Sequence, residues 1–272
     1  MSQDVMTVPR GRLRVRMVNK FPLAARREAI RHVSYDLHGL PEITGLCQRY
    51  QEGTAVILGG GPSVDQYAKT IRTLQAQGAL VLTIERMYPW CHRHGITPEY
   101  VVAQDASEDV IEAFATIWPG SIFLLAAQCP ATVFARLKDE QTYFYHTSGD
   151  IPLDELGGPT ATGVHLNAGG SVVLGSLSLA MFLGLSTLHL FGFDCHVTAG
   201  HYAQGIAGVG VPPERIQVYV GDRPFTTTLP YASMAQQFFE LKTIGEQEGL
   251  LKQITVYGDS LVTAMSPALQ GA

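Results

Sequence analysis

The chain has 272 residues, of which 46% are hydrophobic and 16% are charged, and its formal net charge is −5. A chain of this size and composition can bury a core of its own, which excludes a disordered protein. No apolar run reaches the ~18 residues that a membrane helix needs, so we expect a cytoplasmic protein without a membrane span. The four cysteines lie far apart without Cys-x-x-Cys spacing, which argues against a thiolate zinc site and a disulfide framework.

The N-terminal segment, residues 1–52, is predicted to be a basic appendage. Its first 34 residues hold eight Lys and Arg side chains against two acidic ones. We expect a strand over residues 12–18, a helix over residues 23–32 and a second helix that opens at Pro41. A basic arm can bind an anionic partner, but no aromatic residues interleave with the arginines as base-stacking platforms would require. We therefore favour a solvated strand face and do not expect nucleic-acid binding.

From residue 53 onward, short apolar segments alternate with segments of helical periodicity. The expected strands are residues 55–58, 79–84, 99–103, 121–126, 142–146, 187–191 and 253–257. The expected helices are residues 64–77, 87–94, 108–117, 171–183 and 229–248. This alternation indicates βαβ units, and hence a mostly parallel sheet with helices on both faces. We predict an α/β, Rossmann-like domain over residues 53–260, followed by a tail over residues 261–272.

Two long loops are expected within this domain. Residues 148–168 are rich in Gly, Pro and Thr, and residues 192–228 show little periodicity. The second loop carries Arg215 and Arg223, whose guanidinium groups pair well with phosphate oxygens, so it could serve as a lid over a phosphate site. It could equally form an oligomer contact, and a homo-oligomer therefore stays open.

The most informative motif is the glycine loop Gly59-Gly60-Gly61-Pro62-Ser63, which follows an apolar strand and opens a helix. Glycines let the backbone approach a ligand closely, and Pro62 and Ser63 suit a first helical turn. The free N–H groups at the positive end of that helix form an anion site. No Gly-Lys-Ser/Thr follows, so this is not a Walker A loop, and Glu85 is the only acid placed to bind a ribose. We predict that the loop binds the phosphates of a nucleotide.

Polar residues also follow other predicted strands at the same edge of the sheet. Asp105 and Asp194 could hold Mg²⁺ together with phosphates and water, bind a ribose hydroxyl or act as a base. Each could instead cap a helix or fix a loop. His201 lies in the segment just beyond Asp194, and its ordinary pKa of ~6.5 suits a catalytic acid or base, although a surface histidine is the alternative. Asp105, Asp194 and His201 are the candidate catalytic residues.

Several motifs in order resemble those of a known family. They are Gly59-Gly60-Gly61-Pro62-Ser63-Val64, the segment from Gly95 to Asp105, Gly170-Ser171-Val172, Leu183-Gly184 and Leu190-Phe191-Gly192-Phe193-Asp194. Together they resemble the MptE-like domain, which includes archaeal 6-hydroxymethylpterin diphosphokinases and the bacterial motility-associated factors (Maf proteins) linked to flagellin glycosylation. The pattern is also similar to bacterial sialyltransferases that carry Gly-Asn-Gly-Pro-Ser. The resemblance covers about residues 54–200 and adds Gly170 and Ser171 to the candidate ligand-binding residues.

The resemblance implies a nucleotide-dependent transferase of the MptE-like/Maf type. Transfer of a sugar from a nucleotide-sugar donor to a small-molecule or glycan acceptor is favoured. The reason is that Gln104-Asp105-Ala106-Ser107 has one carboxylate where the diphosphokinases carry an Asp-x-Asp pair. Diphosphate transfer from ATP to 6-hydroxymethyl-dihydropterin is the alternative, and a non-catalytic nucleotide-binding or assembly module is a third reading. Mg²⁺ is the candidate cofactor.

Overall fold

The computed structural model describes residues 5–8, 39–147, 164–197, 203 and 214–271. The strand and the first helix that we expected over residues 12–18 and 23–32 lie outside these ranges, as does His201. Among the helices that the structure describes, none has both the length and the apolarity to cross a membrane.

Eight parallel strands form the main sheet, in the order β11-β8-β2-β3-β4-β5-β6-β7. Their bounds are β2 Gly53–Leu58, β3 Leu80–Ile84, β4 Tyr100–Ala103, β5 Ile122–Ala126, β6 Thr142–Thr147, β7 His165–Leu166, β8 Leu185–Phe191 and β11 Gln253–Val256. The central strands are apolar and buried along nearly their whole length, because helices cover both faces. The predicted α/β class with a mostly parallel sheet is therefore confirmed.

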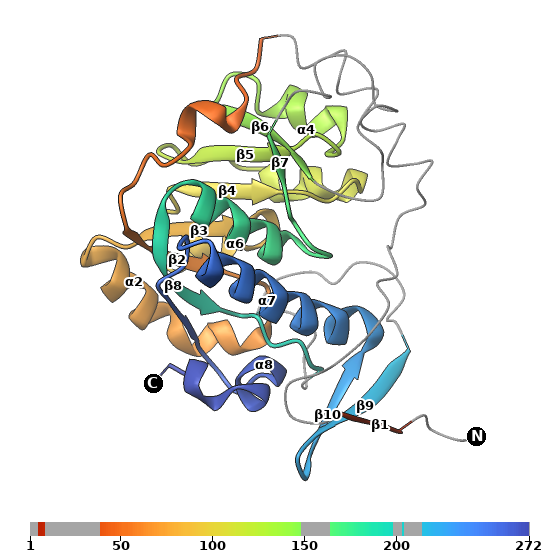
Figure 1. Ribbon diagram of the computed structural model, residues 1–272. Coiled ribbons are helices and arrows are strands. Elements are labelled where there is room, and N and C mark those ends of the chain that lie inside the picture. Colours follow the sequence, from red (N-terminus) through yellow and green to blue (C-terminus); the bar gives the residue numbers. More distant parts are fainter. Residues whose placement is uncertain (1–4, 9–38, 148–163, 198–202, 204–213, 272) are drawn as a thin grey trace.

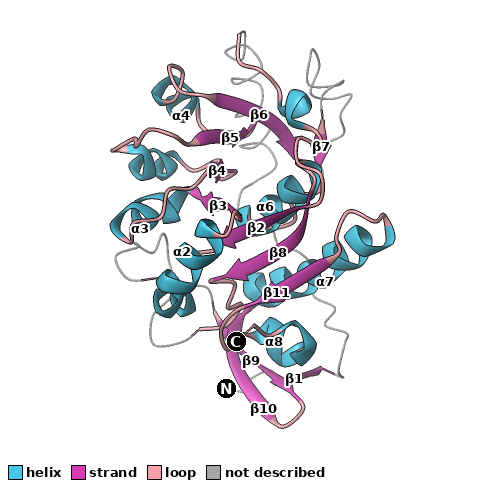
Figure 2. Ribbon diagram, turned by 90° about the vertical axis from the view of Figure 1, so that its left-hand side faces the viewer, coloured by secondary structure: helices cyan, strands magenta, loops and turns pink. Residues whose placement is uncertain are grey.

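The helices form a layer on each face of this sheet (Figure 2). One layer contains α2 Ala68–Ala76, α3 Tyr88–Arg93 and α4 Ala131–Arg136, and the other contains α6 Val172–Phe182 and α7 Leu229–Gln247. The 3₁₀ helices are η1 Ile43–Leu46, η2 Pro62–Tyr67, η3 Glu85–Met87, η4 Glu108–Phe114 and η6 Pro267–Leu269. α6 has no charged residue and is buried almost throughout, since it packs against several strands of the sheet and lies beside α7 (Figure 1).

The prediction of one long loop over residues 192–228 is wrong for the second half of this range. β9 Arg215–Val220 and β10 Arg223–Thr228 form an antiparallel hairpin, and β1 Val5–Val8 pairs parallel to β9. Gly221 occupies the two-residue turn with φ of +61°, a conformation that glycine adopts readily. The Gly-Asp pair at this turn is a hairpin signal, but the strands are half exposed and polar at many positions, so their periodicity is weak.

The C-terminal segment, which we predicted to be a tail, packs against the main sheet. α8 Leu261–Met265 begins with two fully buried side chains, Leu261 and Val262. The N–H of Gly271 donates to the carbonyl oxygen of Val256 at 2.9 Å. The division into residues 1–52, 53–260 and 261–272 stays a prediction.

The strand order creates a crevice at one point of the carboxyl edge. From β2 the chain moves through β3, β4, β5, β6 and β7 in one direction, and α6 then returns it to β8 on the other side of β2. The topological switch point therefore lies between β2 and β8. Loops that leave two such strands diverge, and open α/β sheets bind ligands in the space between them.

Candidate functional site

The glycine loop after β2 and the loop after β8 are joined by hydrogen bonds at the switch point. The backbone N–H of Ser63 donates to Oδ2 of Asp194 at 3.0 Å, and the Ser63 hydroxyl donates to Oδ1. The N–H of Gly61 donates to the carbonyl oxygen of Gly192 at 2.8 Å. Asp194 thus accepts hydrogen bonds at the start of η2, where the N–H groups that lack helical partners favour a negative charge.

Close backbone approach explains why glycines stand here. A Cβ on Gly61 would come within 2.7 Å of the Asp194 carboxylate, and a Cβ on Gly59 would lie 2.6 Å from the carbonyl oxygen of Gly192. Gly192 itself has φ of +66°, in the left-handed region that favours glycine. The glycines therefore let two loops touch, and the Asp194 carboxylate fills the space in front of Gly61.

Asp194 is held firmly in this position. Cys195, the next residue, has φ of +53°, which turns the chain sharply in a conformation uncommon for residues with a Cβ. The carbonyl oxygen of Asp194 accepts from the N–H of Leu261 at 3.0 Å and lies 3.0 Å from Nδ1 of His196. Burial raises the pKa of the Asp194 carboxyl, and the hydrogen bonds from Ser63 oppose this rise.

The start of α6 lies beside the glycine loop. As a crossover between parallel strands, α6 runs antiparallel to them, so its N-terminus lies at the carboxyl edge. A Cβ on Gly59 would be 3.1 Å from Cγ2 of Val173 in the first turn. Ser171 caps the helix with its side-chain oxygen, and the N–H of Gly170 donates to Oε1 of Gln237 at 2.6 Å. The positive end of α6 therefore lies at the same crevice.

Glu85 and Asp105 belong to a second acidic region, at the ends of β3 and β4. Glu85 is 1% exposed, and among the described residues its Oε2 has no hydrogen-bond partner. Burial raises the pKa of Glu85 to about 7; Arg86 opposes the rise, while the charges of Asp105 and Asp109 add to it. Oδ1 of Asp105 accepts from the N–H of Ser107 at 3.2 Å, a local turn that fixes the loop.

The strand order separates the two carboxylates that we predicted as metal ligands. Asp105 follows β4 and Asp194 follows β8, with β2 and β3 between them. Three strand spacings amount to about 14 Å between the strand ends. Mg²⁺ binds oxygens at about 2.0–2.1 Å, so one ion cannot bind both residues in this arrangement. Either carboxylate alone could hold Mg²⁺ with ligand phosphates and water, and a metal stays a prediction.

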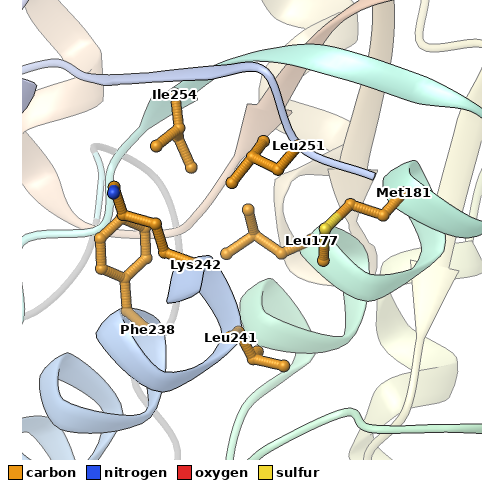
Figure 3. A pocket seen from close by; sticks show the side chains of 7 residues that line it. All are labelled: Leu177, Met181, Phe238, Leu241, Lys242, Leu251 and Ile254. Carbon is orange, nitrogen blue, oxygen red and sulfur yellow. The ribbon is translucent and has the colours of Figure 1, made fainter. Parts of the chain in front are cut away.

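Over the described ranges, no group of three or more His, Cys, Asp and Glu side chains is arranged to hold a metal ion. Figure 3 shows a small pocket between α6, α7 and the start of β11. Its lining is apolar except for one residue and consists of Leu177, Met181, Phe238, Leu241, Lys242, Leu251 and Ile254. The pocket encloses about 10 Å³, room for one water molecule, and lies at the amino end of β11. It is therefore distinct from the carboxyl-edge crevice.

The structure brings the predicted site residues together in two groups. The glycine loop, Asp194 and the start of α6 form one group, and Glu85 with Asp105 forms the other. Two neighbours were not among the predicted site residues. A Cβ on Gly258 would come within 2.9 Å of the Ser63 side chain, and Oε1 of Gln104 is buried without a partner among the described residues. Gln104 directly follows β4, and Gly258 is the second residue after β11. This position at a strand end was the signal in the sequence that could have identified them.

Comparisons with known proteins agree with the fold. A family model described as "6-hydroxymethylpterin diphosphokinase MptE-like" matches residues 31–200, and no curated protein sequence matches the chain. The fold is similar to that of the MAf glycosyltransferase from Magnetospirillum magneticum AMB-1, with a TM-score of 0.65 and 15% identity. That similarity covers 88% of this chain but only 37% of the glycosyltransferase chain. Because the family model matches well over half of the residues, the chain belongs to the MptE-like family.

Proposed function

We propose that the chain is a nucleotide-dependent transferase that moves a sugar from a nucleotide-sugar donor to an acceptor. The observation that carries this proposal is the convergence at the switch point. There the glycine loop, Asp194 and the N-terminus of α6 meet outside the carboxyl ends of β2 and β8. This is where open parallel sheets bind nucleotides, and helix N-termini there favour phosphate groups.

The two groups of site residues suit different parts of such a ligand. The N-terminus of α6 at Gly170 and Ser171 would bind the phosphates, and the glycine loop, whose Gly61 and Ser63 N–H groups already donate to Gly192 and Asp194, would lie against them. Glu85 and Asp105, which follow β3 and β4 at two and three strands from β8, would contact the ribose or a phosphate-bound Mg²⁺. Asp194 would orient the loop through Ser63, and His201 would take the proton of the acceptor hydroxyl. A location in the cytoplasm is part of the same proposal.

The comparisons support the transferase class. The family model takes its description from a diphosphokinase, and the solved neighbour is named a glycosyltransferase. The chain spans little more than a third of that neighbour, so the acceptor of the larger protein is not assigned to this chain. Diphosphate transfer from ATP to a pterin alcohol is a second candidate, because the family description names it.

Isothermal titration calorimetry against CMP, UDP, GDP and ATP, each with and without Mg²⁺, tests the proposal. Selective binding of a pyrimidine or guanine nucleotide is the expected result and fits a sugar donor. Selective ATP binding that depends on Mg²⁺ would favour the diphosphokinase. Absence of binding at millimolar concentrations would overturn the nucleotide site.

Turnover separates an enzyme from a binding module. Release of nucleotide from the matching nucleotide sugar would be measured for the wild type and for Asp105→Asn. We expect the variant to keep nucleotide binding within a few fold and to lose most turnover. Binding without any turnover in the wild type, across a panel of acceptors, would favour a non-catalytic module.

A further inference from the structure

An exposed ion pair lies where the β9–β10 hairpin meets the loop after β11. The guanidinium of Arg223, the first residue of β10, forms a hydrogen-bonded salt bridge with Oδ2 of Asp259. The two side chains are 52% and 61% exposed, so solvent and solutes reach both. The guanidinium carbon also lies 4.5 Å from the ring centre of Phe225, which orients its plane.

The salt bridge adjoins the glycine loop. Gly258, next to Asp259 in the chain, is so close to Ser63 that a Cβ there would lie 2.9 Å from its hydroxyl oxygen. The hydrogen bond from Arg223 lowers the pKa of Asp259, and His196 lowers it further. His196 also acts to lower the pKa of Asp194, which accepts hydrogen bonds from Ser63. The ion pair therefore belongs to the electrostatic surroundings of the switch point.

The hairpin fixes the backbone of Arg223 relative to that point. The N–H of Val197 donates to the carbonyl oxygen of Thr226 at 2.7 Å, and the Thr227 hydroxyl donates to the carbonyl oxygen of Cys195 at 2.7 Å. These bonds tie β10 to the loop after β8. The Arg223 side chain thus extends into solvent from a rigid base, which keeps the entropic cost of binding low.

We propose that Arg223 binds a phosphate group of the ligand, and that Asp259 occupies its guanidinium until the phosphate displaces it. This inference rests on the proposed function, since it assigns a further binding residue to the same site. Carboxylates and phosphates accept the same paired N–H bonds from arginine, so one can replace the other. An exposed salt bridge contributes little to stability, and its exchange for a phosphate therefore costs little.

The inference predicts opposite effects for the two partners. Arg223→Gln removes the charge that binds the phosphate, and we expect affinity to fall about tenfold or more. Asp259→Asn removes the competing carboxylate, and we expect affinity to rise about two- to fivefold. If the salt bridge only held the hairpin in place, both substitutions would change the affinity in the same direction. Both residues are exposed, so neither change threatens folding, which thermal melts would verify.

The matched control is Lys252→Gln. Lys252 is exposed to a similar degree, at 54%, and forms a salt bridge with Glu52, but it lies just before β11, at the amino end of the sheet and away from the carboxyl-edge crevice. Calorimetry would use CMP, UDP, GDP, ATP and inorganic pyrophosphate in EDTA, with each variant and the wild type. We expect the control to leave every dissociation constant within about twofold, because it keeps both Arg223 and Asp259.

Each outcome has a defined meaning. Equal dissociation constants for the wild type and Arg223→Gln overturn the inference but leave the proposed function standing. A weakened Arg223→Gln with an unchanged Asp259→Asn keeps the phosphate contact and overturns the competition. If no nucleotide binds the wild type, the proposed function fails; pyrophosphate binding that depends on Arg223 would still support the anion site, and its absence would overturn both.

Discussion

Asp194 and Glu85 both lie at the carboxyl ends of parallel strands, yet their carboxylates have opposite surroundings. Asp194 accepts two hydrogen bonds from Ser63, so its buried charge is compensated by neighbouring donors. Glu85 is buried with one oxygen that has no hydrogen-bond partner among the described residues, and burial raises its pKa to about 7. One region of the edge is therefore built around a carboxyl group that accepts hydrogen bonds from neighbouring donors, and the other around a carboxyl group that gains or loses its proton near neutral pH.

The largest effect is expected where the two loops touch. Gly192→Val would place a Cβ against the carbonyl oxygen of Gly59 and force a β-branched residue to φ of +66°. We expect the free energy of unfolding, measured by urea denaturation, to fall by about 4 kcal/mol or more. Gly221→Val is the control, because Gly221 has φ of +61° but no atom of the part of the chain that the structure describes lies within 4 Å of a Cβ there. Its loss should be about 1–2 kcal/mol, and equal losses would contradict the role of loop contact.

The pH dependence of stability distinguishes the second region. Because the pKa of Glu85 is raised from 4.5 to about 7, the folded protein holds a proton that the unfolded chain releases. This bound proton contributes fully to the free energy of unfolding below pH 4.5, and the contribution is lost as the pH rises through 7. The full loss is about 3 kcal/mol, from roughly 1.4 kcal/mol per pKa unit.

Glu85→Gln removes this titration and leaves a neutral side chain of the same size. We therefore expect the stability of the wild type relative to the variant, measured by denaturation from pH 4.5 to 8.5, to decline as the pH rises to about 7 and to level off above that. Glu112→Gln, which changes an exposed carboxylate on η4, should leave the wild-type profile unchanged. A constant difference between the wild type and Glu85→Gln across this range would show that Glu85 titrates normally.

A smaller effect on the free energy of unfolding is expected for Asp194, whose carboxylate accepts hydrogen bonds from Ser63. Asp194→Ala leaves the N–H and hydroxyl of Ser63 without their acceptor, and we expect a loss of about 2 kcal/mol at pH 7. Asp194→Asn should lose less, because the amide oxygen still accepts from the N–H. Chemical denaturation measures both. If the two variants were equally destabilised, the ionic charge would matter more than the hydrogen bonds.

The smallest effect concerns the cap of α6. Ser171→Ala removes the side chain that caps the helix, at a cost of about 1 kcal/mol. Thr228→Ala removes the equivalent cap of α7 and should cost a similar amount. Since of these two helices α6 begins beside the glycine loop, nucleotide affinity should weaken in Ser171→Ala and stay unchanged in Thr228→Ala. Equal affinities in both variants would remove α6 from the binding site.

The sequence predicted every strand of the main sheet except β7, because in a parallel sheet covered on both sides the strands are continuous apolar runs; β7 has only two residues and lies in the expected loop over residues 148–168. It also placed Asp105 and Asp194 at strand ends. It could not show that Asp194 bonds to Ser63, since that contact depends on β8 lying next to β2, and strand order is not encoded locally. The burial of Glu85 was hidden for a similar reason, because burial depends on segments that pack over the strand end.

The hairpin was missed for a different physical reason. Its strands bury few side chains, among them Val218 and Phe225, so alternation is weak over six residues. The turn at Gly221 carried a usable signal, but the glycine and proline residues before it resembled a continuous loop. The arginines that we placed on a flexible lid are instead on strands, which changes Arg223 from a mobile side chain to an anchored one.

The position of β2 has a consequence for synthesis of the chain. Its partner β8 begins at Leu185, more than a hundred residues after β2, so ribosomes finish β3 to β7 while one edge of β2 is still open. Unpaired edges of apolar strands recruit other strands and promote aggregation. A nascent chain halted before Leu185 would expose this edge together with the unpaired glycine loop, and it would be a substrate for chaperones until β8 closed the sheet.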